Sequence, residues 1–133
     1  MAFVLDSSVA LTWLMPDEAN EHADALARRL ETENALVPPI WPLEVGNAML
    51  TAVRRKRITN AEFQRYVAAL GDIPIDIDGG AQLSDILRLA QQCQLTSYDA
   101  AYLELAQRRN ASLATFDVAL RAACHSLEIP VLP

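Results

Sequence analysis

The chain has 133 residues, enough for one domain with its own hydrophobic core and too few for two. Its 11 Lys and Arg residues stand against 17 Asp and Glu, which gives a formal net charge of −6 at pH 7. Taken alone, this balance argues against a protein that coats nucleic acid by general electrostatic attraction. It permits local binding through metal ions, an arginine cluster or a partner subunit.

The cysteine content and the hydropathy pattern indicate in which compartment the protein is expected. Two cysteines, Cys93 and Cys124, are typical of a reducing cytoplasm rather than of a disulfide framework. No apolar run reaches the roughly 18 residues of a membrane span. The apolar segment 2–15 lacks a basic start and is broken by Asp6, so it predicts a strand and a helix rather than a signal peptide. We therefore expect a cytoplasmic protein without membrane contact.

Short apolar runs alternate with helical periodicity from one end of the chain to the other. The predicted strands are 2–5, 35–37, 73–77, 112–114 and 129–132. The predicted helices run from Asp6 through Leu14, from Asp17 or Glu18 through Leu30 with Ala19 on its apolar face, over 42–55 and 59–70, from Gly80 to Cys93, and over 98–108 and 117–124.

Local signals support several of these elements. Thr59 and Glu62 have the spacing of a capping box, which predicts that a helix begins there. Thr96 or Ser97 can cap the helix that follows. Pro74 cannot donate a hydrogen bond, so it places the third strand at a sheet edge or makes it a strand start.

Strands that are separated by helices predict parallel pairing, because parallel strands need long crossovers. We expect an α/β fold: a three-layer α/β/α domain with a central, mostly parallel sheet of four to five short strands. Because no linker, repeat or low-complexity segment interrupts the pattern, residues 1–133 are predicted to form a single domain.

Four isolated carboxylates carry most of the functional information: Asp6, Glu44, Asp99 and Asp117. Asp6 and Asp117 follow predicted strands, Glu44 lies in the first turn of the helix after the second strand, and Asp99 begins a helix. Sites in parallel sheets form at the carboxyl ends of the strands, so all four side chains can face one crevice. Clustered carboxylates repel one another, and a divalent cation is the natural compensation. The pattern therefore predicts a metal-dependent phosphodiesterase.

The segments around these acids resemble, in order, the four acidic motifs of PIN-domain ribonucleases, and most of all the VapC toxins of toxin–antitoxin systems. The four segments are Val4-Leu5-Asp6-Ser7-Ser8-Val9, Pro42-Leu43-Glu44-Val45-Gly46-Asn47-Ala48, Leu95-Thr96-Ser97-Tyr98-Asp99-Ala100-Ala101-Tyr102 and Leu113-Ala114-Thr115-Phe116-Asp117. The resemblance covers nearly the whole chain and shows no departure at the acidic positions.

The resemblance implies a catalytic Mg²⁺ or Mn²⁺ site formed by the four acids. Asp6 and Asp99 would be direct ligands, and Glu44 and Asp117 would bind a second ion or the metal-bound water. Thr115 would support the site through its hydroxyl, and Ser7 through a backbone-capping role. The implied partners are an RNA substrate, a VapB-like antitoxin and a second copy of the chain, which similar proteins bind through helices in the region of 41–55 and 59–71.

Simpler interpretations exist for each residue. Asp6 and Asp117 can cap helices, and Asp99 can be a first-turn acid favoured by the helix dipole. The basic run 54–57 is explained slightly better as charge at a helix C-terminus and a solvated loop than as an RNA contact. Tyr102 is predicted to be a core or interface residue.

Proteins of several other functions also carry acids at the ends of strands. A receiver-type phosphotransfer domain needs an adjacent acidic pair, but Asp6 has no acidic neighbour. A dehalogenase-like phosphatase needs an Asp where Ser8 stands. The residues present therefore disfavour both functions. A non-catalytic module that binds RNA or a peptide is disfavoured by the intact acids. A PIN nuclease with a housekeeping role in RNA processing remains open.

Overall fold

The computed structural model describes residues 2–18 and 20–133. Its strands are β1 (Ala2–Leu5), β2 (Asn34–Val37), β3 (Ile75–Ile77), β4 (Leu113–Ala114) and β5 (Val131–Leu132). Its helices are α1 (Ser7–Leu14), the 3-10 turn η1 (Pro16–Glu18), α2 (Glu21–Arg29), α3 (Trp41–Arg54), α4 (Asn60–Leu70), α5 (Leu83–Cys93), α6 (Ser97–Arg109) and α7 (Val118–Ser126).

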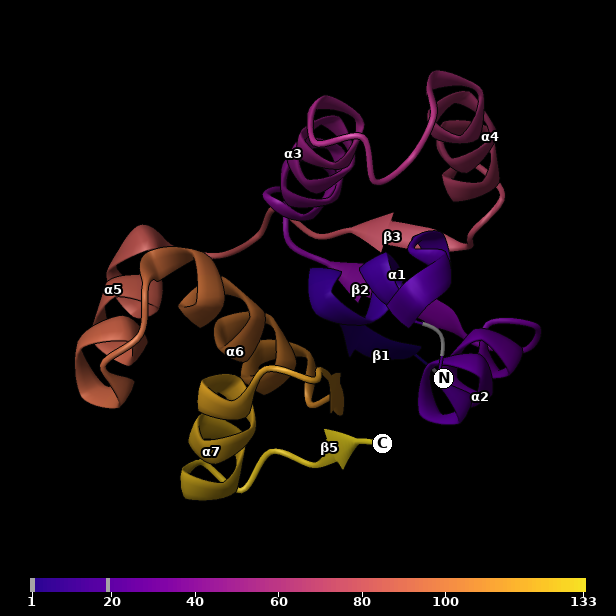
Figure 1. Cartoon of the computed structure of the whole chain (residues 1–133). Helices are drawn as coiled ribbons and strands as arrows, with labels where there is room; N and C mark the ends of the chain where they lie inside the picture. The colour runs from indigo at the N-terminus through magenta and orange to yellow at the C-terminus, as the bar shows by residue number, and fades with distance from the viewer. Residues whose placement is uncertain (1, 19) are drawn as a thin grey trace.

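The five strands form one sheet in the order β3-β2-β1-β4-β5, and every neighbouring pair is parallel. The connections run outward from β1 to β3 on one side, and then return to β4 and β5 on the other. Parallel crossovers are right-handed, so helices before and after this reversal cover opposite faces of the sheet. In Figure 1, α1 to α4 gather on one side of the strands and α5 to α7 on the other. The predicted three-layer α/β/α architecture is confirmed.

The core lies around the central strand. Phe3, Val4 and Leu5 of β1 are buried, as are Ala35, Leu36 and Val37 of β2. These continuous apolar runs are what a strand with helices on both faces requires. The helix α6 covers the sheet with Tyr102, Leu103 and Leu105, all buried. A rigid centre of this kind holds the carboxyl ends of β1 and β4 in fixed positions.

Several local predictions are confirmed. The Thr59 side chain accepts from Glu62 N and Glu62 bonds back to the Thr59 backbone, so the capping box begins α4. The Thr96 side chain caps α6. The edge strand is β3, and Pro74 precedes it, where its missing N–H costs nothing.

Some boundaries differ from the predicted ones. The second helix begins at Glu21 rather than near Asp17, because Asn20 caps it by accepting from Ala23 N at 2.8 Å; Ala19 lies outside the described residues. The third strand begins at Ile75, since Ile73 N still bonds to Leu70 O at the end of α4. No helix among the described residues is long and apolar enough to cross a membrane.

Candidate active site

The four acids gather at the carboxyl edge of the sheet, where the strand order reverses. Asp6 follows β1 and Asp117 follows β4, and these strands are neighbours. A backbone hydrogen bond of 3.0 Å from Asp6 N to Ala114 O joins the two strand ends. Sites in parallel sheets form at such a reversal, outside the carboxyl ends of the strands. The topology thus places Asp6 at the position where a site of this kind forms.

Asp6 is only 4% exposed, and side-chain hydroxyls hold it in place. Ser8 Oγ donates to Asp6 Oδ2 at 2.6 Å, and Thr115 Oγ1 donates to the same oxygen at 2.7 Å. Although Asp6 stands at the N-cap position of α1, its side chain makes no capping hydrogen bond. Neither hydroxyl occupies Oδ1. The carboxylate is therefore oriented by other side chains, and the simpler interpretation as a helix cap is not what its contacts show.

The same hydroxyls extend the network to Asp117. Phe116 N donates to Ser8 Oγ at 3.2 Å, and Asp117 N donates to Thr115 Oγ1 at 3.0 Å. The exposed Asp117 side chain accepts from Leu120 N at 2.9 Å and so caps α7. For Asp117 the capping interpretation holds, and a cap leaves the second carboxylate oxygen available to a ligand.

Glu44 lies in the first turn of α3 and is held by a phenol. The hydroxyl of Tyr102, a fully buried residue of α6, donates a hydrogen bond to Glu44 Oε1. Burial and the nearby Glu44 carboxylate raise the pKa of Tyr102, so the phenol stays neutral and can only donate to the anion. Ser7, the first residue of α1, is near enough to Glu44 to lower the pKa of its carboxyl slightly.

The acids influence one another electrostatically. Burial raises the pKa of Glu44, and the charges of Asp6 and Asp99 raise it further, against the lowering effect of the Tyr102 hydrogen bond. Burial likewise raises the pKa of Asp99, with contributions from Asp117 and Asp6. Like charges have this effect only at short range in a poorly solvated setting. All four predicted acids therefore belong to one electrostatic site.

The donor set suits a hard divalent cation, since carboxylate oxygens are the ligands that Mg²⁺ and Mn²⁺ prefer. A cation would also relieve the repulsion that raises the pKa values of Glu44 and Asp99. Among residues 2–18 and 20–133, no three His, Cys, Asp or Glu side chains already stand in a metal-binding arrangement. The chemistry of the donors thus fits a divalent metal ion.

The order of these elements matches a known family. The PIN domain model matches residues 3–125, which include all four acids. The chain belongs to the PIN domain family. PIN domains are nucleases, so the chain is a nuclease by family. No curated protein is similar enough in sequence to match it.

Solved structures share the PIN fold. The protein PAE2754 from Pyrobaculum aerophilum is 26% identical with a TM-score of 0.71, over 92% of this chain and 79% of that one. A toxin–antitoxin complex from Klebsiella pneumoniae is 20% identical with a TM-score of 0.61, over 86% of both chains. VapBC2 from Rickettsia felis, bound to a DNA fragment from its promoter, is 12% identical with a TM-score of 0.67, over 98% of this chain and 97% of that one.

Two residues of the site were not predicted from the sequence. Tyr102 was expected only to be a core or interface residue, yet its hydroxyl binds Glu44. A usable signal was its spacing from Asp99, because residues three apart share one face of a helix. Ser8 was expected only to contribute to the start of a helix, and it bonds instead to Asp6.

The clustered residues Arg57, Arg108 and Arg109 pair with acids outside this network. Arg57 pairs with Asp17 and Glu18 at 3.2 and 3.3 Å, which ties the turn between α3 and α4 to η1. Arg108 and Arg109 both pair with Asp78, beyond the end of β3. These partners assign Arg57, Arg108 and Arg109 to the scaffold.

Proposed function

We propose that the chain is a Mg²⁺- or Mn²⁺-dependent endoribonuclease and the toxin of a VapBC-type toxin–antitoxin pair. The observation that carries the proposal is the mutual influence of the four carboxylates at the carboxyl ends of β1 and β4. Membership of a nuclease family supports a catalytic role for these acids. Phosphodiester hydrolysis needs an activated water and a neutralised phosphate, and a divalent cation held by carboxylates would supply both.

The residue roles follow from their surroundings. Asp6, oriented by Ser8 and Thr115, and Asp99, in the first turn of α6, would hold the cation directly. Glu44 and Asp117 would complete the site from the two sides of the crevice. A bound Mg²⁺ or Mn²⁺ would supply charge neutralisation and a more acidic water.

The hydroxyls of Tyr102 and Thr115 hold the acids of the site in position. The Tyr102 phenol keeps Glu44 from turning away and helps it to stay ionised, because its hydrogen bond lowers the pKa that burial raises. Thr115 holds the backbone N–H of Asp117 as well as the carboxylate of Asp6, so one hydroxyl sets the distance between two acids.

An antitoxin partner is part of the proposal. The Klebsiella pneumoniae neighbour is a toxin–antitoxin complex, and the Rickettsia felis neighbour is VapBC2 on promoter DNA. Both cover most of this chain with TM-scores above 0.6. A VapB-like protein encoded next to this chain is the expected partner, and a PIN nuclease with a housekeeping role would lack it.

Cleavage of RNA tests the enzymatic part. The purified protein should cut a structured RNA with Mg²⁺ or Mn²⁺ and stop when EDTA is added. The Asp6→Asn, Asp99→Asn double variant should lose both cleavage and Mn²⁺ binding by calorimetry, whereas Asp24→Asn, an exposed acid of α2, should retain both. Undiminished cleavage by the double variant would overturn the site assignment.

Growth tests the toxin part. Expression of the chain alone should arrest growth, and co-expression of the neighbouring small gene should restore it. Glu44→Gln should be harmless, because it removes one charge from the carboxylate site. Arrest that persists in Glu44→Gln would point to a cause other than RNA cleavage, and an active nuclease without growth arrest would favour the housekeeping role.

A further inference from the structure

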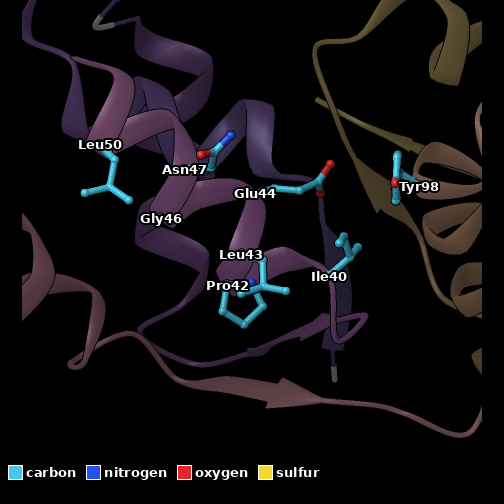
Figure 2. Close-up of a pocket in the computed structure, with 8 residues that line it drawn as sticks. All are labelled: Ile40, Pro42, Leu43, Glu44, Gly46, Asn47, Leu50 and Tyr98. Atoms are coloured by element: carbon cyan, nitrogen blue, oxygen red, sulfur yellow. The ribbon is translucent and has the colours of Figure 1, made fainter. Parts of the chain in front are cut away.

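An open pocket of about 530 Å³ adjoins the carboxylate site on the side of α3. Figure 2 shows the Glu44 carboxylate reaching from α3 toward the side of the opening where Tyr98 stands. The lining residues are Ile40, Pro42, Leu43, Glu44, Gly46, Asn47, Leu50 and Tyr98. Because Glu44 belongs both to this pocket and to the acidic site, a molecule bound in the pocket lies against that site.

The chemistry of the pocket selects an uncharged, flat ligand. Among the residues that line it none is basic, and Glu44 contributes a carboxylate at its edge. A phosphate group would be repelled there, whereas a neutral aromatic ring would not. Tyr98 is 60% exposed and Leu43 is 68% exposed, so an aromatic and an aliphatic surface both face solvent at the opening. Nucleobases bind between such surfaces.

Further side chains suited to RNA binding lie on the exposed face of α3. Leu43, Asn47, Leu50 and Arg54 recur at the spacing of one helical face. Asn47 lines the pocket with an amide, which both donates and accepts hydrogen bonds as a base edge does. Arg54 is exposed about 10 Å further along the helix than Asn47 and can meet a phosphate beyond the pocket.

We propose that this pocket binds an unpaired nucleobase next to the scissile phosphate, with the base stacked on Tyr98 and its edge bonded to Asn47. The inference rests on the proposed nuclease function and assigns two residues outside the carboxylate site, Tyr98 and Asn47, to the binding of the substrate base. A base inside a duplex stays paired and stacked, and cannot enter a pocket with these walls.

Binding of a short single-stranded oligoribonucleotide containing 2-aminopurine, measured in EDTA, tests the pocket. Wild type should quench the fluorophore on binding and should prefer the single strand to its duplex. Tyr98→Ala should weaken binding about 10- to 100-fold and abolish the quenching. Tyr98→Phe keeps the stacking ring and should stay within about threefold of wild type. Val118→Ala, on the exposed surface of α7, is the matched control.

Enzyme kinetics, Mn²⁺ binding and sedimentation of the Tyr98→Ala variant distinguish a base-binding pocket from a subunit interface. Tyr98→Ala should raise KM more than it lowers kcat, and its calorimetric Mn²⁺ binding should match wild type. If wild type cleaves RNA and Tyr98→Ala binds and cleaves equally well, the pocket inference is overturned and the nuclease stands. If wild type neither binds nor cleaves RNA, both fail. If Tyr98→Ala dissociates a dimer in sedimentation without losing the base signal, the surface is a subunit interface.

Discussion

The Thr115 hydroxyl donates a hydrogen bond of 2.7 Å to Oδ2 of Asp6, from a residue 109 positions away in the chain. The same hydroxyl accepts from Asp117 N at 3.0 Å. Thr115 is fully buried directly after β4, so its rotamer is fixed by packing. One side chain therefore links the carboxylate of Asp6, which follows β1, to the backbone of Asp117, which follows β4.

Thr115→Val keeps the shape of the side chain and removes this link. We expect stability to fall by about 1–3 kcal/mol, because a buried carboxylate loses a donor. Activity should fall about 10- to 100-fold, as for other groups that orient metal ligands. Chemical denaturation and kcat with Mn²⁺ measure the two effects.

Thr12→Val is the matched control for this substitution. The Thr12 hydroxyl donates to Val9 O within α1 and touches no acid of the site. It should leave kcat within about twofold of wild type. Equal losses of activity in the two variants would assign Thr115 to stability alone.

Tyr102→Phe removes the phenol that holds Glu44. Loss of this hydrogen bond removes a contribution that lowers the pKa of Glu44, so that pKa should rise further. Protons then compete with the metal at higher pH, and the acidic limb of the pH–activity profile should move to higher pH. Tyr66→Phe, which removes only a 3.4 Å bond to Glu62 on α4, should leave the profile unchanged. An unmoved profile in Tyr102→Phe would exclude this role.

The sequence could predict the acids but not their orienting groups. Asp6 and Asp117 follow apolar runs and sit where parallel strands end, which periodicity alone predicts. The partners of Asp6 depend on which strands are neighbours. Nothing local in the sequence says that β4 rather than β2 brings a hydroxyl to Asp6, and so Thr115 entered only through the family resemblance.

Mn²⁺ should raise the melting temperature of wild type, because it binds the folded site and relieves repulsion. Asp99→Asn should raise the melting temperature of the metal-free protein at pH 7. The pKa of Asp99 is raised in the fold, so its ionised form opposes folding, and the stability it costs is regained as pH falls through its raised pKa toward its usual value of 3.8.

The advantage of Asp99→Asn over wild type should therefore shrink as the pH is lowered toward about 4. Differential scanning calorimetry in EDTA at several pH values measures this. Asp85→Asn, an exposed acid with a 3.7 Å contact to Arg88, should gain nothing. No effect of millimolar Mn²⁺ on wild type would mean that the four acids do not share a cation.

Asp78 fastens the end of β3 to the C-terminal end of α6. Arg108 and Arg109 lie 3.0 and 2.6 Å from its two oxygens, and Gly80 N donates at 2.8 Å. The hydrogen bond from Arg108, then those from Gly80 and Arg109, hold the pKa of Asp78 well below its usual value. A lowered pKa stabilises the fold above the usual value, and this stability is lost as the carboxylate is protonated at lower pH.

Asp78→Asn should consequently cost roughly 1–3 kcal/mol at pH 7, and the difference from wild type should shrink below about pH 4. Urea denaturation at pH 7 and pH 3 provides the comparison. Arg88→Gln, which breaks the exposed pair with Asp85, should cost less than about 1 kcal/mol at either pH. A cost that is the same at both pH values would refute the electrostatic explanation.

The ion pairs of Asp78 with Arg108 and Arg109 could not be predicted from the sequence. Arg108 and Arg109 look like ordinary positive charge at a helix C-terminus. Their partner lies 30 and 31 residues earlier in the chain, beside an edge strand whose place in the sheet depends on the whole topology. Helix periodicity and capping depend on nearby residues and were predictable. The pairing of distant charges depends on tertiary contacts and was not.

Helices α3 and α4 offer a surface for assembly with a second copy of the chain. The helix α4 buries none of its residues, and its apolar side forms a groove of about 390 Å³ with α3. Phe63, Val67 and Leu70 line this groove, and Val67 is 44% exposed. An amphipathic helix with an uncovered apolar side gains free energy by packing against another subunit. We therefore expect a homodimer, in which the groove is covered by a second copy.

Sedimentation at micromolar concentration should show twice the 14.6 kDa mass of one chain. Val67→Lys places a charge in the groove and should weaken the dimer at least about 10-fold. Val118→Lys makes the same change at a side chain that is 82% exposed on α7, and should leave the mass unchanged. Because Tyr98 lies in the pocket beside Glu44 and not in this groove, Val67→Lys should keep the 2-aminopurine signal. A wild-type protein that sediments only at 14.6 kDa would refute the dimer, whatever its activity on RNA.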